Sequence, residues 1–321
     1  MHQAALFTSR ATDTLRGRRT VRHFLEGPAL TPADLSLVLL VTEDDTTERP
    51  MPTVTTIGIP PVIRRAAALG LRSVKLFAES SRRDASGEVS LATDTLMVRA
   101  IRAVKDADPT MAVMTETCLC SYTPDGVCYV TDDDGRPDVP ATIDITARQA
   151  VVHAEAGADI VGPASMVTGT VAGVRAALDS TGFHTVSIMP HVIFWSHLYD
   201  RFRLTMGATP KAGTNREFQI HPGKADQFVE TALQMVGDGA DMILLEPALY
   251  CGDVLATLRQ HTRVPLVPFS VSGEYTALTT VNEAGLRDVR LLVELFTMLK
   301  RAGAHATLTY AALDIAQQLN A

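Results

Sequence analysis

Short apolar runs alternate with helical patterns from residue 31 onward, and this alternation limits the possible fold more than any other feature of the chain. Short runs rich in Val, Ile and Leu predict buried strands, whereas apolar residues spaced three and four apart predict helices. Repeated β and α units build a parallel sheet with right-handed crossovers. The expected strands are residues 37–41, 73–78, 111–116, 159–162, 185–189, 242–245, 264–269 and 307–310.

Eight such units in a chain of 321 residues predict an α/β fold of the (β/α)8 TIM-barrel type, with an extended N-terminal arm, rather than an open sheet. Residues 154–161 and 238–244 are similar to each other, and each contains a helix end, a glycine cap and a buried strand. Residues 131–141, which are rich in Asp, Gly and Pro, predict a loop or lid. The expected helices include residues 143–156, 171–178 and 225–236.

The first 30 residues are polar and basic, and they form a segment distinct from the rest. Arg16, Arg18, Arg19 and Arg22 lie close together there. Such a segment predicts a solvated arm over residues 1–30, followed by one barrel domain over residues 31–321. No segment within residues 31–321 has the composition of a linker to a second domain.

The overall charge excludes some classes of function. The chain has 36 acidic and 29 basic side chains, a net charge of -7, and only 5% aromatic residues. This acidic field disfavours nucleic-acid binding, and few aromatic side chains are available for base stacking. Because no apolar run approaches the roughly 20 residues that a bilayer requires, we expect no membrane span and a cytoplasmic location.

Three of the four cysteines form a cluster directly after the third expected strand. Cys118, Cys120 and Cys128 are close in sequence, and such cysteines in a cytosolic chain are typical of metal ligands or reactive thiols. Three thiolates suit Zn²⁺ and leave its fourth position to water or substrate. The alternative is three buried, inert cysteines. Cys251 is expected to be a free thiol.

The sequence around these cysteines resembles a known family. Residues 117–123 (Thr-Cys-Leu-Cys-Ser-Tyr-Thr), together with Gly126 and Cys128, resemble the zinc-binding loop of zinc-type porphobilinogen synthase, or 5-aminolevulinate dehydratase. Residues 271–275 and 309–314 are similar to that family's seventh- and eighth-strand signatures. The resemblance implies a (β/α)8 barrel, a zinc cofactor and a homo-oligomer, usually an octamer and sometimes a hexamer, in which the arm wraps a neighbouring subunit.

The two residues that define the family's covalent chemistry have changed. The family condenses two molecules of 5-aminolevulinate through lysine Schiff bases at the ends of the fifth and sixth strands. Glu246 stands at the sixth-strand position, and Ile193 or Phe194, depending on the placement of a one-residue gap, stands at the fifth. A Schiff base requires a nucleophilic amine, which none of these side chains has.

No other lysine is in register with those positions. Lys75 falls within the second strand and is predicted to be a structural or exposed strand residue, and Lys211 is predicted to lie in a loop. We therefore expect a divergent member of the family that forms no lysine imine. The lysines of the chain are Lys75, Lys105, Lys211, Lys224 and Lys300.

Part of the family's substrate site is retained. Ser272 and Tyr310 match residues that hold the carboxylate of one substrate, and Arg203 matches one of two arginines that hold the other. Asn215 replaces the second arginine, with Arg216 beside it. The resemblance therefore implies binding of a small carboxylate substrate. The residues that it assigns to binding are Ser272, Tyr310, Arg203, Arg216, Gln219 and Ser165.

New titratable residues accompany these losses. His191 and His197 flank the end of the fifth strand, and Glu246 ends the sixth, its neighbour in a barrel. A His and a Glu that share a cavity are suited to acid–base catalysis or to metal binding. Alternatively, Glu246 pairs with Arg203 or a backbone donor, and the histidines only pack.

Three functions are compatible with this pattern. The first is a zinc-dependent lyase that dehydrates, condenses or cyclises small keto or amino acids in a specialised biosynthetic pathway, without lysine imines. The second is a non-catalytic metabolite-binding or regulatory homologue, and the third, disfavoured by the lysines, is an authentic porphobilinogen synthase. The expected pocket is bounded by Cys120, His191, Arg203, Glu246, Ser272 and Tyr310.

Overall fold

The computed structural model describes residues 19–24, 29–44, 46–211, 217–283 and 285–321. The chain divides into two units, Met1–Leu30 and Thr31–Ala321. In the first, helix α2 spans Arg19–Phe24. Within the described ranges, no helix combines the length and apolar character needed to cross a bilayer.

The second unit is a parallel barrel. Its strands pair in the order β7-β6-β3-β2-β1-β13-β10-β9-β8. Their burial on both faces agrees with strands packed between a barrel interior and a layer of helices. The strands are β1 (Leu35–Val41), β2 (Ser73–Ala78), β3 (Ala112–Thr117), β6 (Ile160–Pro163), β7 (Ser187–Ile188), β8 (His191–Ile193), β9 (Ile243–Glu246), β10 (Leu266–Ser270) and β13 (Thr307–Thr309).

The fifth barrel strand closes the sheet. β7 and β8 are two parts of this one strand, separated by Met189 and Pro190. β7 pairs with β6 on one side, and β8 pairs with β9 on the other. Backbone hydrogen bonds from Met189 N to Val161 O and from Leu244 N to Pro190 O continue the pairing across the gap. The predicted eight-stranded barrel is therefore confirmed.

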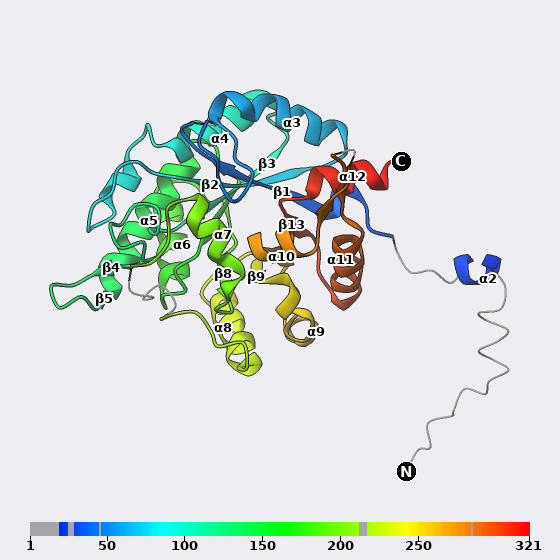
Figure 1. Ribbon diagram of the computed structural model, residues 1–321. Helices are drawn as coiled ribbons and strands as arrows, with labels where there is room; N and C mark the ends of the chain where they lie inside the picture. Colours follow the sequence, from blue (N-terminus) through cyan, green and yellow to red (C-terminus); the bar gives the residue numbers. More distant parts are fainter. Residues whose placement is uncertain (1–18, 25–28, 45, 212–216, 284) are drawn as a thin grey trace, which may run out of the picture. The chain divides into compact units, whose positions relative to one another are not determined.

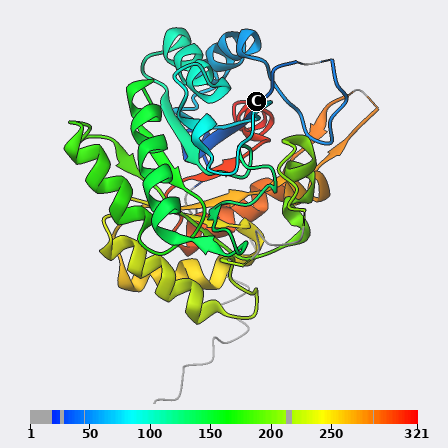
Figure 2. The ribbon, with the colours of Figure 1, turned by 90° about the vertical axis from the view of Figure 1, so that its left-hand side faces the viewer.

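The longer helices lie outside the strands in both Figure 1 and Figure 2. Side chains fix the first turns of two of them, because Thr95 accepts a hydrogen bond from Val98 N and Asp138 accepts one from Ala141 N. The helices are α3 (Ile59–Ala68), α4 (Leu96–Ala107), α5 (Val139–Glu155), α6 (Thr170–Ser180), α7 (Asp200–Thr205), α8 (Ala225–Gly237), α9 (Gly252–His261), α10 (Ser272–Ala277), α11 (Arg290–Ala302) and α12 (Ala312–Leu319).

Short elements decorate the connections. Two antiparallel hairpins, β4 (Val130–Thr131) with β5 (Pro137–Asp138) and β11 (Thr280–Val281) with β12 (Arg287–Asp288), lie outside the barrel sheet. Residues 131–141, predicted to be a loop or lid, contain the connecting loop of the first hairpin, parts of both its strands and the start of α5. The 3-10 turns are η1 (Pro32–Asp34), η2 (Thr56–Gly58), η3 (Glu88–Leu91), η4 (His197–Tyr199) and η6 (Ala248–Tyr250).

The two similar sequence phrases have the predicted structure. Gly157 follows α5 with a φ of 106°, and Gly239 follows α8 with a φ of 104°. Both values lie in the left-handed region, where glycine carries no Cβ penalty, so each helix ends there and the chain turns into the next buried strand.

Candidate active site

A cavity opens where the barrel strands end at their carboxyl side, which is the face that carries the functional site in barrels of this kind. The empty space between its lining residues, including the part open to solvent, is about 670 Å³. Phe77, Phe202 and Phe269 form an apolar wall. The lining also includes Ile193 and the polar residues Glu116, Cys118, Cys120, Cys128, Ser165, His191, Arg203, Gln219, Glu246, Ser272 and Tyr310.

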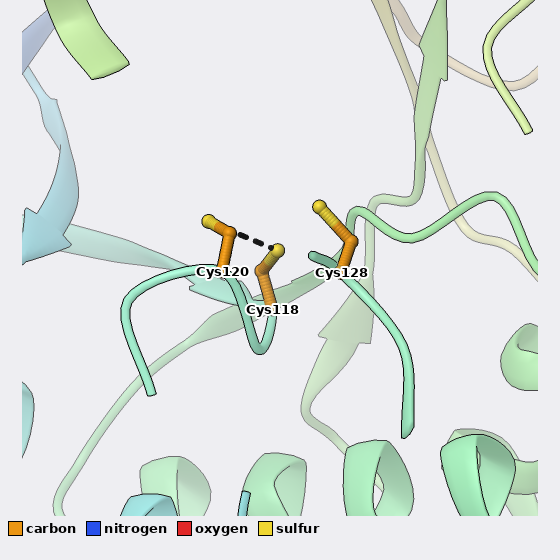
Figure 3. A group of neighbouring side chains, drawn as sticks. All are labelled: Cys118, Cys120 and Cys128. Carbon is orange, nitrogen blue, oxygen red and sulfur yellow. Dashed lines mark hydrogen bonds between the residues drawn. The ribbon is translucent and has the colours of Figure 1, made fainter. Parts of the chain in front are cut away.

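The three cysteines converge at this cavity. Their side chains project to the same side of the loop after β3 (Figure 3), and their sulfur atoms all lie within 4.8 Å of one another. Cys118 Sγ donates a hydrogen bond to Cys120 Sγ at 3.4 Å, and this bond, followed by one from Cys128, lowers the pKa of Cys120 well below its usual value. Three convergent soft donors, of which one favours the thiolate, fit a metal ion.

Arg83 fixes the loop that carries these cysteines. Its Nη1 donates to the carbonyl oxygens of Cys120 and Thr123 at 3.1 and 2.9 Å, and its Nη2 donates to Gly207 O at 2.8 Å. One guanidinium group therefore connects the cysteine loop to the segment after α7, and sequence reasoning did not identify this role.

The end of the fifth strand shows which of Ile193 and Phe194 faces the barrel interior. Ile193 lines the cavity, whereas Phe194 points away from it and stacks on Phe228 of α8 with ring centroids 4.3 Å apart. Successive strand residues face opposite sides, so only one of the two can face the barrel interior. Ile193 is the inward residue, and it is the register partner of Glu246 in the neighbouring strand.

His191 and Glu246 are hydrogen-bonded to each other. His191 Nδ1 lies 2.9 Å from Glu246 Oε1, and the side chains are 1% and 6% exposed. Burial raises the pKa of Glu246 to about 8. Burial, followed by the charge of Lys75, lowers the pKa of His191 well below its usual value. The imidazole is therefore neutral near neutral pH, and Glu246 is the partner that titrates in this range.

The structure excludes one of the two roles predicted for Lys75. The residue is fully buried in the barrel interior, so the alternative of an exposed strand residue is wrong. Its Nζ lies 2.9 Å from Thr115 O and 2.9 Å from His191 Nε2. The side chain is not part of the cavity lining, because His191 stands between its amine and Glu246.

Glu116 is a second residue that sequence reasoning missed. It is the penultimate residue of β3 and lines the cavity next to the cysteine cluster. Burial, followed by the charge of Cys120, raises its pKa well above the usual value. Its position at the end of a barrel strand was the available signal, since such positions face the cavity.

The residues assigned to carboxylate binding fall into two groups. Arg203, with a side chain 6% exposed, brings a positive charge to the cavity wall. Burial raises the pKa of Tyr310 well above its usual value, so its phenol keeps the proton needed to donate a hydrogen bond. Gln219 Oε1 is buried without a hydrogen-bond partner in the described part of the chain. Arg203, which also pairs with Asp200 at 3.6 Å, Tyr310 and Gln219 therefore bring a charged, a hydroxyl and an amide group to the cavity lining.

Ser272 and Ser165 line the cavity with hydroxyl groups already engaged by the backbone. Ser272 Oγ donates to Leu198 O at 2.8 Å and accepts from Phe202 N at 3.1 Å. Ser165 Oγ accepts from Val167 N at 3.2 Å. Ser272 therefore supports the segment that carries Arg203 in addition to facing the cavity.

One predicted site residue, His197, is not brought to the cavity. His197 has a side chain 73% exposed, lies 3.2 Å from Asp200, and is absent from the lining, so the prediction that it shares the pocket is wrong. It belongs to η4, where the chain has already left the barrel strand. Arg216 lies outside the described residues. Cys251 is a buried free cysteine whose thiol donates to Pro247 O at 3.0 Å.

Fold and cavity together define a (β/α)8-barrel protein with a three-cysteine cluster suited to a metal ion. The family model described as Delta-aminolevulinic acid dehydratase matches residues 9–318. The chain belongs to this family, which confirms the resemblance found in the sequence.

Proteins similar to this chain are named delta-aminolevulinic acid dehydratases. Delta-aminolevulinic acid dehydratases of Escherichia coli and Halalkalibacterium halodurans are 34% and 32% identical to the chain; each alignment covers 95% of it and, respectively, 96% and 95% of the relative. The solved Toxoplasma gondii enzyme, in complex with its product porphobilinogen, has a TM-score of 0.89 and 29% identity, and the match covers 95% of this chain and 90% of that one.

Proposed function

We propose that the protein is a zinc-dependent lyase that acts on a small keto or amino carboxylic acid without forming a lysine imine. The observation that carries this proposal is the pairing of Ile193 with Glu246 at the cavity, opposite an intact three-cysteine cluster. The dehydratases of this family are lyases, and the cavity keeps groups suited to binding and proton transfer.

The residues divide the proposed reaction into binding and proton transfer. Arg203 and Tyr310 bind the substrate carboxylate by charge and by hydrogen bonding. Glu246 donates a proton to the hydroxyl group, which departs as water, since a carboxyl whose pKa is about 8 is protonated at neutral pH. The resulting carboxylate then accepts the proton of the neighbouring carbon as the double bond forms, which restores the acid. The phenylalanine wall excludes water from the carbon skeleton. Zinc held by Cys118, Cys120 and Cys128 would supply Lewis-acid polarisation of a substrate oxygen.

Two alternatives make different predictions. An authentic porphobilinogen synthase needs an amine in the cavity, and no lysine is part of its lining in the described ranges. A non-catalytic homologue would bind a carboxylate ligand without consuming it.

Self-association through the N-terminal arm and a cytoplasmic location remain predictions from the sequence.

The function is tested by incubating the zinc-loaded protein with 5-aminolevulinate and measuring porphobilinogen. We expect no product above background, because neither position of the family's Schiff-base lysines carries an amine. The Escherichia coli relative, assayed in parallel, is the positive control. Substantial porphobilinogen formation would contradict the proposal. Candidate keto acids that are bound but never converted would favour the non-catalytic alternative.

Replacing Arg83 with Met should weaken zinc binding by about 10- to 100-fold, the usual cost of losing a group that orients metal ligands. The change removes the three hydrogen bonds that fix the cysteine loop. The affinity is measured by competition with a chromophoric chelator. Arg82→Met is the matched control, because Arg82 is exposed and pairs with Asp94 at the surface. Equal affinities of the two variants would show that Arg83 does not orient the loop.

A further inference from the structure

A lysine is enclosed in the barrel interior although the proposed reaction does not use its amine. Lys75 is 0% exposed, and burying an ammonium group is costly unless hydrogen bonds and opposite charges compensate. The structure provides two acceptors, Thr115 O and His191 Nε2, each 2.9 Å from Nζ. His191 in turn contacts Glu246, so the lysine is the inner end of a chain that leads to the cavity.

The hydrogen-bonding capacities along this chain determine the position of one hydrogen atom. An ammonium group has only donors, so His191 Nε2 must accept. A neutral imidazole carries a single N–H, which is then on Nδ1. That atom lies 2.9 Å from Glu246 Oε1, so the ring donates to the carboxyl group. The same bond leaves Oε2 outside the contact with His191.

We propose that Lys75 is a positioning residue that fixes His191 in its Nδ1–H tautomer, so that the imidazole donates to Oε1 of Glu246 and orients the carboxyl group toward the cavity. The inference rests on the proposed function only for the catalytic role of Glu246. The tautomer of His191 follows from the contacts alone.

The neighbouring strand leaves room for this amine. A Cβ atom at position 162 would lie 2.8 Å from Lys75 Nζ and 3.0 Å from Thr115 O. Gly162, in β6, therefore permits the close approach of the lysine to its acceptor, and any larger residue would displace one of them. The position of the amine is thus determined from two strands, β3 and β6, in addition to its own.

The amine stays protonated near neutral pH although it is buried. Burial lowers the pKa of Lys75 only to about 8, above the pH of the experiment described below. His191 and His153 add no repelling positive charge, because burial lowers the pKa of both. At pH 6.5 the ammonium form prevails and remains a donor to His191.

The experiment is solid-state ¹⁵N NMR of the full-length protein labelled with [¹⁵N]histidine, at pH 6.5. The His191 signals are identified by their loss in His191→Asn. In the wild-type protein we expect a neutral ring with Nδ1 protonated and Nε2 unprotonated. In Lys75→Met, His191 Nε2 loses its donor and Glu246 loses the charge that most lowers its pKa. Glu246 then stays protonated and donates to Nδ1, so the ring hydrogen should move to Nε2.

Lys105→Met is the matched control, since Lys105 lies on α4 and pairs with Asp159 outside the barrel interior. Its His191 signals should equal those of the wild type. A wild-type ring protonated at Nε2, or an unchanged Nδ1–H form in Lys75→Met, would overturn the proposal. The wild-type spectrum alone tests the tautomer if Lys75→Met does not fold. None of these readouts depends on turnover, so a failure here is distinguishable from failure of the proposed lyase activity.

Discussion

Replacing Cys120 with Ala should remove both bound zinc and turnover. The change reduces the cluster from three sulfur donors to two and deletes the one cysteine of the cluster whose pKa is lowered. We expect zinc affinity to fall by more than about 100-fold, beyond the upper range for loss of an outer partner. The metal content per chain after dialysis, measured by elemental analysis, tests this directly.

Cys251→Ala is the matched control for this experiment. Cys251 is also buried and unoxidised, but it lies after η6 and outside the cluster. The control protein should retain its zinc and its activity on whichever keto or amino acid is found to be the substrate. Full metal content in Cys120→Ala would contradict the assignment of the cluster. Retained turnover in a metal-free protein would remove zinc from the proposed reaction.

Glu246→Gln should reduce turnover by about 100- to 10,000-fold, the usual contribution of a general acid. The amide keeps the shape of the carboxyl group but cannot donate the proton that the leaving hydroxyl needs. The measurement is kcat on the converted substrate, with binding of the substrate determined separately. Substrate affinity should change little, because the carboxylate is held by Arg203 and Tyr310 in this account.

The pH dependence of the wild type tests the same role. The raised pKa means that Glu246 is protonated below about pH 8 and ionised above it. A reaction that needs the protonated acid is therefore constant at lower pH and falls as the pH rises through about 8.

Glu274→Gln is the control for Glu246→Gln, because Glu274 is a buried carboxyl with a pKa raised to about 7 that does not line the cavity. Turnover of Glu246→Gln equal to that of this control would contradict the assignment.

The architecture was predictable because burial of barrel strands leaves a direct trace in the sequence. All eight predicted runs overlap observed strands, and the run at 73–78 has the same bounds as β2. The fifth run was the least accurate, since the sequence pattern gave no indication that the strand continues past Pro190 to Ile193. Only its pairing on both sides shows where it ends.

The site was predictable where position along a strand decides what a residue faces. Glu246 and the cysteines follow strand ends directly, and the structure places them in one cavity. His197 was misplaced because the chain leaves the barrel after Ile193 and enters η4, a change that spacing does not encode. The choice between a structural and an exposed Lys75 was left open, because sequence alone does not show that His191 and Gly162 provide an acceptor and space for a buried ammonium group.

We propose that this barrel binds a metal ion at its three-cysteine cluster, while no lysine amine lines its cavity in the described ranges. The direct test is borohydride reduction of the zinc-loaded protein in the presence of 5-aminolevulinate, followed by intact-mass analysis. We expect an unmodified chain, whereas the Escherichia coli relative treated in the same way should be modified. A stable adduct on the chain, mapped to Lys75 or to any other lysine, would contradict it.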